Sequence, residues 1–60
     1  MKITKQELEQ KDLMFTNSLD DLIEVSLLNG HFQVWLNGVI VKSTKGLKPA
    51  QQKLDFLLTI

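Results

Sequence analysis

The sequence contains no cysteine and no arginine, and its only histidine is His31. Without cysteine the chain forms no disulfide. A single histidine also cannot build a structural zinc site, because zinc takes four ligands drawn mainly from cysteine and histidine. We therefore expect no metal and no other cofactor. The lack of arginine counts against sequence-specific recognition of nucleic acid, since the guanidinium group is the commonest reader of base edges.

Long apolar runs are lacking as well. No uninterrupted apolar stretch approaches the ~18 residues that a membrane-spanning helix needs. Residues 1–12 are charged and do not contain the apolar region of a signal peptide. We expect no membrane partner, and together with the missing cysteine this favours a cytoplasmic location.

The chain is short, and its 60 residues allow one domain, residues 1–60. A domain of this size buries only about 60% of the surface of its unfolded chain. Small domains are usually reinforced by disulfides, a metal or a partner chain. Because the first two are excluded, we expect a homodimer.

Two Asn-Gly pairs, Asn29-Gly30 and Asn37-Gly38, interrupt an alternation of apolar and polar residues. Asn-Gly in this setting is the strongest short-range signal of a β-hairpin, because a type I′ turn needs positive φ at both central residues. Two-residue turns at both places predict a three-stranded antiparallel meander. Across the second turn the predicted pairs are Leu36–Val39, Trp35–Ile40, Val34–Val41, Gln33–Lys42 and Phe32–Ser43.

This register separates the side chains into two faces, because neighbours along a strand point to opposite sides. One face is wholly apolar: Ile23, Val25, Leu27, Phe32, Val34, Leu36, Val39 and Val41. The other is mixed: Glu24, Ser26, Leu28, His31, Gln33, Trp35, Ile40 and Lys42. A helix over residues 19–28, with Asn29-Gly30 as its C-cap, is an alternative for the first strand. The matching registers and the β-branched Ile23 and Val25 favour the strand.

Helices are predicted on both sides of the sheet segment. Residues 4–7, Thr-Lys-Gln-Glu, have the form of a capping box, which predicts a helix from Lys5 to Met14. Pro49 suits a first helical turn. The helix that follows has one apolar side: Leu47, Ala50, Leu54, Leu57 and Leu58. The expected fold is α+β, with an N-terminal helix, a three-stranded antiparallel β-meander, and a C-terminal helix packed on one face of the sheet.

Trp35 is the leading candidate for function because it lies on the mixed face, opposite Ile40 and near Leu28. Either the first helix covers it, or it is an exposed aromatic anchor of the kind enriched at binding hot spots. An apolar patch framed by polar residues suits a protein contact. The framing residues are Glu24, Gln33 and Lys42.

We expect no catalytic residues and therefore no enzyme. The predicted register gives His31 only Leu28 and Thr44 as cross-strand neighbours, and neither can orient an imidazole for catalysis. The adjacent Asp20 and Asp21 point apart and do not form a carboxylate pair. The three glycines are scattered turn residues and form no phosphate-binding loop.

Lys42, Lys45 and Lys48 form a lysine strip in the second half of the chain, where four lysines face one acid; the first half carries three lysines and six acids. Such lysines either guard a sheet edge against aggregation or contact phosphates. A three-stranded sheet followed by a helix, with "STKGLKPAQQKLDFL" at the junction, resembles in layout the arm-type DNA-binding domains of phage-type integrases. That resemblance covers about half the chain and implies binding to the major groove. The arginines and strongly basic sheet of those domains are missing here.

These observations predict a small non-enzymatic protein-binding module that docks through its open sheet face or as a homodimer. Inhibitors and accessory factors, including those of phages and mobile elements, are often of this kind. The alternative is a DNA-binding accessory protein that uses the sheet and the lysine strip.

Overall fold

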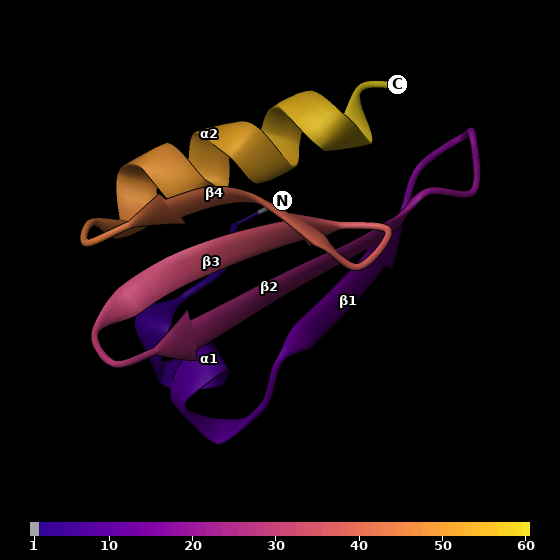
Figure 1. Cartoon of the computed structure of the whole chain (residues 1–60). Coiled ribbons are helices and arrows are strands. Elements are labelled where there is room, and N and C mark those ends of the chain that lie inside the picture. Colours follow the sequence, from indigo (N-terminus) through magenta and orange to yellow (C-terminus); the bar gives the residue numbers. More distant parts are fainter. Residues whose placement is uncertain (1) are drawn as a thin grey trace.

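The protein is a four-stranded antiparallel sheet with two helices, seen in a computed structural model that describes residues 2–60 (Figure 1). In chain order the elements are α1 (Lys5–Gln10), β1 (Leu13–Thr16), β2 (Leu22–Leu28), β3 (His31–Leu36), β4 (Val39–Thr44) and α2 (Leu47–Leu58). The strands lie in the order β1-β2-β3-β4, so each pairs with its neighbour in sequence. The α+β class and both helices are confirmed, and residues 22–28 form a strand. The sheet has four strands, not the three expected.

The additional strand comes from residues that we expected to be helical. Helix α1 ends at Gln10 because Lys11 is extended, with φ −162° and ψ 158°. Strand β1 then pairs with β2, Leu13 opposite Val25 and Phe15 opposite Ile23. The predicted helix to Met14 is therefore too long. Strand pairing determines the secondary structure of this segment. As a strand, β1 satisfies backbone groups along one edge of β2 and places two apolar side chains against the core.

The short helix α1 is held by its cap and by one buried side chain. The Glu7 N–H donates to Thr4 Oγ1 at 3.2 Å, and the Thr4 N–H donates to Glu7 Oε1 at 3.1 Å, which confirms the capping box. Leu8 is its only buried residue. A helix of six residues is unstable alone, so the packing of Leu8 in the core keeps it in place.

Both Asn-Gly turns form as predicted. The φ angles are 52° at Asn29, 77° at Gly30, 50° at Asn37 and 84° at Gly38, the left-handed values that a type I′ turn requires. The register between β2 and β3 is the one that a two-residue turn at Asn29-Gly30 requires, with Leu28 opposite His31 and Val25 opposite Val34.

A β-bulge changes the register between β3 and β4. The first two predicted pairs, Leu36–Val39 and Trp35–Ile40, are confirmed, but Val34 then lies opposite Lys42. The remaining pairs are Gln33–Ser43 and Phe32–Thr44, so the predicted pairs Val34–Val41, Gln33–Lys42 and Phe32–Ser43 are wrong. Val41 is the extra residue. The apolar run Val39-Ile40-Val41 has no alternation to fix the register, and bulges are common on edge strands.

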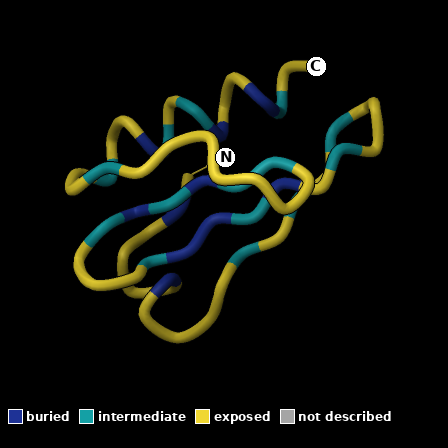
Figure 2. The backbone as a smooth tube through the Cα atoms, viewed as in Figure 1, coloured by how far each residue is buried: buried dark blue, intermediate teal, exposed yellow. Residues whose placement is uncertain are grey.

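The hydrophobic core lies on one face of the sheet, and both helices contribute to it. Its buried members are Ile3, Leu8, Ile23, Val25, Phe32, Val34, Ala50, Leu54 and Leu57. Figure 2 shows these buried positions between the strands, α2 and the N-terminal segment. Leu8 of α1 and Leu54 of α2 belong to the same cluster as Ile23 and Val25, so both helices cover the same face of the sheet. Among residues 2–60, no helix combines the length and apolar character that crossing a bilayer requires.

Candidate docking surface on the open sheet face

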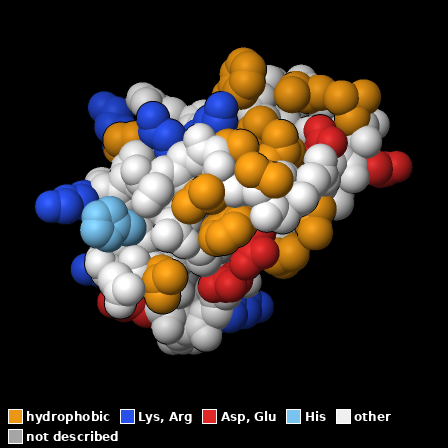
Figure 3. Space-filling view, in the orientation of Figure 1, with side chains coloured by type: hydrophobic (Ala, Val, Ile, Leu, Met, Phe, Trp, Pro, Cys, Tyr) orange, Lys and Arg blue, Asp and Glu red, His pale blue; other side chains and the backbone are white. Residues whose placement is uncertain are grey.

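The sheet face opposite the core, here called the open face, is covered by neither helix. By register, its side chains are those of Met14, Thr16, Leu22, Glu24, Ser26, Leu28, His31, Gln33, Trp35, Ile40 and Ser43. Figure 3 shows hydrophobic side chains gathered over the sheet, with acidic side chains directly beside them. The first of our two alternatives for Trp35, cover by the N-terminal helix, is therefore wrong, because α1 packs on the other face.

A central row of side chains crosses all four strands of the open face. Met14, Glu24, Trp35 and Ile40 lie opposite one another from β1 to β4. Met14 is 53% exposed and Ile40 is 42% exposed. Because side chains directly opposite one another lie about 4.5–5.5 Å apart at Cβ, these residues form a continuous surface. Leu22 and Leu28, both exposed, extend it along β2.

Trp35 is fixed in position on this surface by its indole N–H. The Nε1–H group donates to Ser26 Oγ at 3.3 Å, and the Ser26 hydroxyl in turn donates to Gln33 Oε1 at 3.5 Å. Ser26 is only 9% exposed although it lies on the open face. The half-buried indole thus satisfies its one polar group within the sheet and offers its apolar ring to a contact.

Two carboxyl groups lie together on this surface, Glu24 within the row and Asp12 beside it. Asp12, immediately before β1, contacts Glu24, and a hydrogen bond between the two carboxyls raises the pKa of Glu24; partial desolvation and the like charge of Asp12 act in the same direction. The three causes all act in the direction of a raised pKa. Sequence reasoning placed Glu24 at the rim of the patch but missed Asp12, because β1 was not predicted.

A polar network supports one end of the open face. Asn37 Oδ1 accepts from the Leu22 N–H at 2.8 Å, and Asn37 Nδ2 donates to Asp21 Oδ1 at 3.0 Å. Asn17 Nδ2 lies 3.1 Å from both Asp21 Oδ2 and the Leu57 carbonyl oxygen. The bonds from Asn37, and secondly from Asn17, lower the pKa of Asp21. Asn37 therefore does more than form the turn that the sequence predicted: it ties the β3–β4 turn to the start of β2.

The lysine strip does not lie on the open face. The bulge places Lys42 opposite Val34 and so on the helix-bearing side of the sheet, whereas the sequence predicted it opposite Gln33. Lys45 follows β4, and Lys48 lies in the first turn of α2. Lys42 therefore does not share the open face with Trp35 and Ile40.

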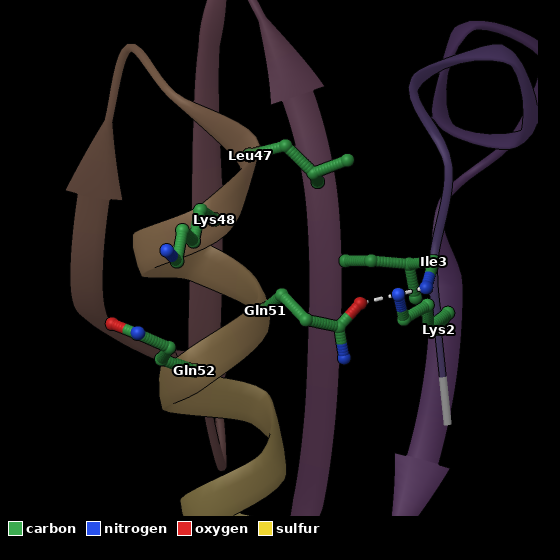
Figure 4. A pocket seen from close by; sticks show the side chains of 6 residues that line it. All are labelled: Lys2, Ile3, Leu47, Lys48, Gln51 and Gln52. Atoms are coloured by element: carbon green, nitrogen blue, oxygen red, sulfur yellow. Dashed lines mark hydrogen bonds between the residues drawn. The ribbon is translucent and has the colours of Figure 1, made fainter.

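Lys48 lines an open groove between the N-terminal segment and α2 (Figure 4). The other lining residues are Lys2, Ile3, Leu47, Gln51 and Gln52. Across the groove, the Ile3 N–H donates to Gln51 Oε1 at 2.7 Å. This bond helps to hold the N-terminal segment against α2.

His31 Nδ1 lies 3.1 Å from the Asn29 carbonyl oxygen at the β2–β3 turn. Within residues 2–60, no group of three or more histidine, aspartate or glutamate side chains is placed to hold a metal ion. No protein-family model, curated protein or solved structure matches this chain.

Proposed function

We propose that this protein is a small protein-binding module of the inhibitor or accessory-factor type, which docks on its partner through the open face. One observation carries the proposal: each of the four strands contributes a large apolar side chain around an anchored tryptophan, on the face that neither helix covers. Tryptophan is among the residues most enriched at the centres of protein interfaces.

The energetics of burial support this role. Ile23, Val25, Val34 and Leu54 are fully buried on the other face, so the core is complete without the open-face residues. Fully burying a large apolar side chain is worth about 1.5–3 kcal/mol. A partner that covers Met14 and Ile40, which are 53% and 42% exposed, would gain about half of that amount at each, and it would also bury the part of Trp35 that remains exposed.

The proposal is tested by affinity capture from the native host with matched aromatic variants, with and without nuclease. Trp35→Ala removes the anchor, whereas Phe56→Ala removes an aromatic side chain of α2 that is 60% exposed and lies outside the open face. We expect a nuclease-resistant protein partner to be retained by the wild type and Phe56→Ala and lost by Trp35→Ala. A partner that the folded Trp35→Ala protein retains equally well would contradict the proposal.

A further inference from the structure

We propose that the partner segment bound by the open face is amphipathic and basic, with lysine or arginine beside its apolar side chains. This inference rests on the proposed docking function and specifies the chemistry of the ligand. It follows from the charge of the face: the carboxyl groups in and beside its central row are Glu24 and Asp12, and none of its paired positions carries a lysine.

The two carboxyls lie together, and none of the paired positions of the open face holds a lysine. Their mutual contact raises the pKa of Glu24, and no opposing influence lowers it. Lys42 is on the helix-bearing side of the sheet. His31 occupies the far end of β3, at the β2–β3 turn. A cation from the partner beside Met14 and Trp35 would therefore relieve a repulsion that the protein alone leaves in place.

A second copy of the chain fits this surface less well. A two-fold interface brings the same patch against itself, so it would gather two copies of the Asp12–Glu24 pair with no lysine of the open face between them. The sheet edges are also poorly suited to pairing. β4 carries the Val41 bulge and Lys42, both devices that discourage edge-to-edge association, and β1 has only four residues.

The test uses two synthetic helical peptides with the same leucine positions, one with lysine and one with glutamate at every polar position. Trp35 is the only tryptophan and the chain has no tyrosine, so its fluorescence reports directly on the open face. At about 150 mM salt, where the Debye length is about 8 Å, we expect the lysine peptide to bind at least tenfold more tightly than the glutamate peptide.

Charge-neutral variants separate this surface from general attraction of a cationic peptide. Asp12→Asn with Glu24→Gln should reduce the preference to less than threefold. The control pair Glu9→Gln with Asp20→Asn removes the same charge outside the open face and should leave the preference at tenfold or more. Trp35→Ala, followed by calorimetry, should abolish binding of the lysine peptide.

The outcomes distinguish this inference from the docking function beneath it. If both peptides bind equally and Trp35→Ala abolishes both, the face docks apolar segments without charge selection, and the inference is overturned while the docking function stands. If neither peptide binds and the wild type forms a dimer that Trp35→Ala disrupts, the occupant is a second copy and the inference is again overturned. If neither binds and the protein is monomeric, both proposals fail.

Discussion

Asn37→Gly isolates the side chain that locks the β3–β4 turn to the start of β2. Glycine accepts the φ of 50° at this position, so the turn is kept, but the bonds to the Leu22 N–H and to Asp21 are lost. Asn29→Gly is the matched control: Asn29 has φ 52° in the same kind of turn, and its side chain makes no hydrogen bond to any of residues 2–60. The backbone effect of glycine is common to both variants, so their difference measures the side chain.

The expected size of that difference follows from the bond to Leu22. A hydrogen bond of this kind contributes about 0.5–1.5 kcal/mol net. With an m-value of about 1 kcal/mol/M for urea, Asn37→Gly should unfold at a urea midpoint about 0.5–1.5 M below that of Asn29→Gly at pH 7. In a domain whose core supplies no more than about 3–5 kcal/mol, such a shift is readily measured by circular dichroism.

The pH dependence provides a second readout of the same lock. The bonds from Asn37 and Asn17 lower the folded-state pKa of Asp21 below its unfolded value. The stabilisation by Asp21 is therefore complete above the unfolded pKa, near ~3.9, and is lost as the pH falls through the folded pKa. The difference in urea midpoint between the two variants should become smaller below pH ~4. Equal midpoints at pH 7 would contradict the claim that the Asn37 side chain stabilises the fold.

Three further predictions concern the turn, the carboxyl pair and the lysine strip. Gly38→Val forces a β-branched residue to φ 84° and should destabilise the fold by more than ~1 kcal/mol in urea unfolding; an unchanged midpoint would contradict the turn geometry. Because the folded-state pKa of Glu24 is raised, the wild type loses stability as the pH rises through that pKa. Glu24→Gln should therefore be more stable than the wild type at pH 7, and the difference in melting temperature should disappear in acid. Thermal melts that show the reverse order would be inconsistent with the Asp12 contact. Because the net charge of the chain is zero, we expect that the lysine strip forms no submicromolar complex with duplex DNA at about 150 mM salt. Fluorescence anisotropy that detects such a complex would favour the DNA-binding alternative.

The parts of the fold that the sequence predicted are those encoded by strong local signals. Asn29-Gly30 and Asn37-Gly38 fix their own φ angles and thereby the register of residues 23–36. The capping box begins α1 at Lys5, and the apolar side of α2 matches its buried residues. Each of these patterns lies within a few residues and needs no distant partner.

The features that the sequence did not predict depend on contacts between distant segments. Strand β1 is only four residues long, too short for its alternation to stand out, and it exists because the edge of β2 accepts it. The Val41 bulge arises in an apolar run with no alternation. For the candidate site, the pattern placed Trp35, Ile40, Glu24, Gln33 and Leu28 on the open face correctly. It could not add Met14 or Asp12, which reach that face only through β1.

The affinity of the purified partner for Trp35→Ala, measured beside the stability of the variant, tests the docking role of the open face most directly. Truncating a central anchor typically costs 2 kcal/mol or more of binding, so we expect a Kd at least ~30-fold higher than that of the wild type. The variant should keep its circular dichroism spectrum, because the core on the other face is complete without Trp35. Trp35→Phe, which retains most of the apolar ring surface, should restore much of the affinity. A folded Trp35→Ala protein that binds the partner with unchanged Kd would contradict the claim that this face is the docking surface.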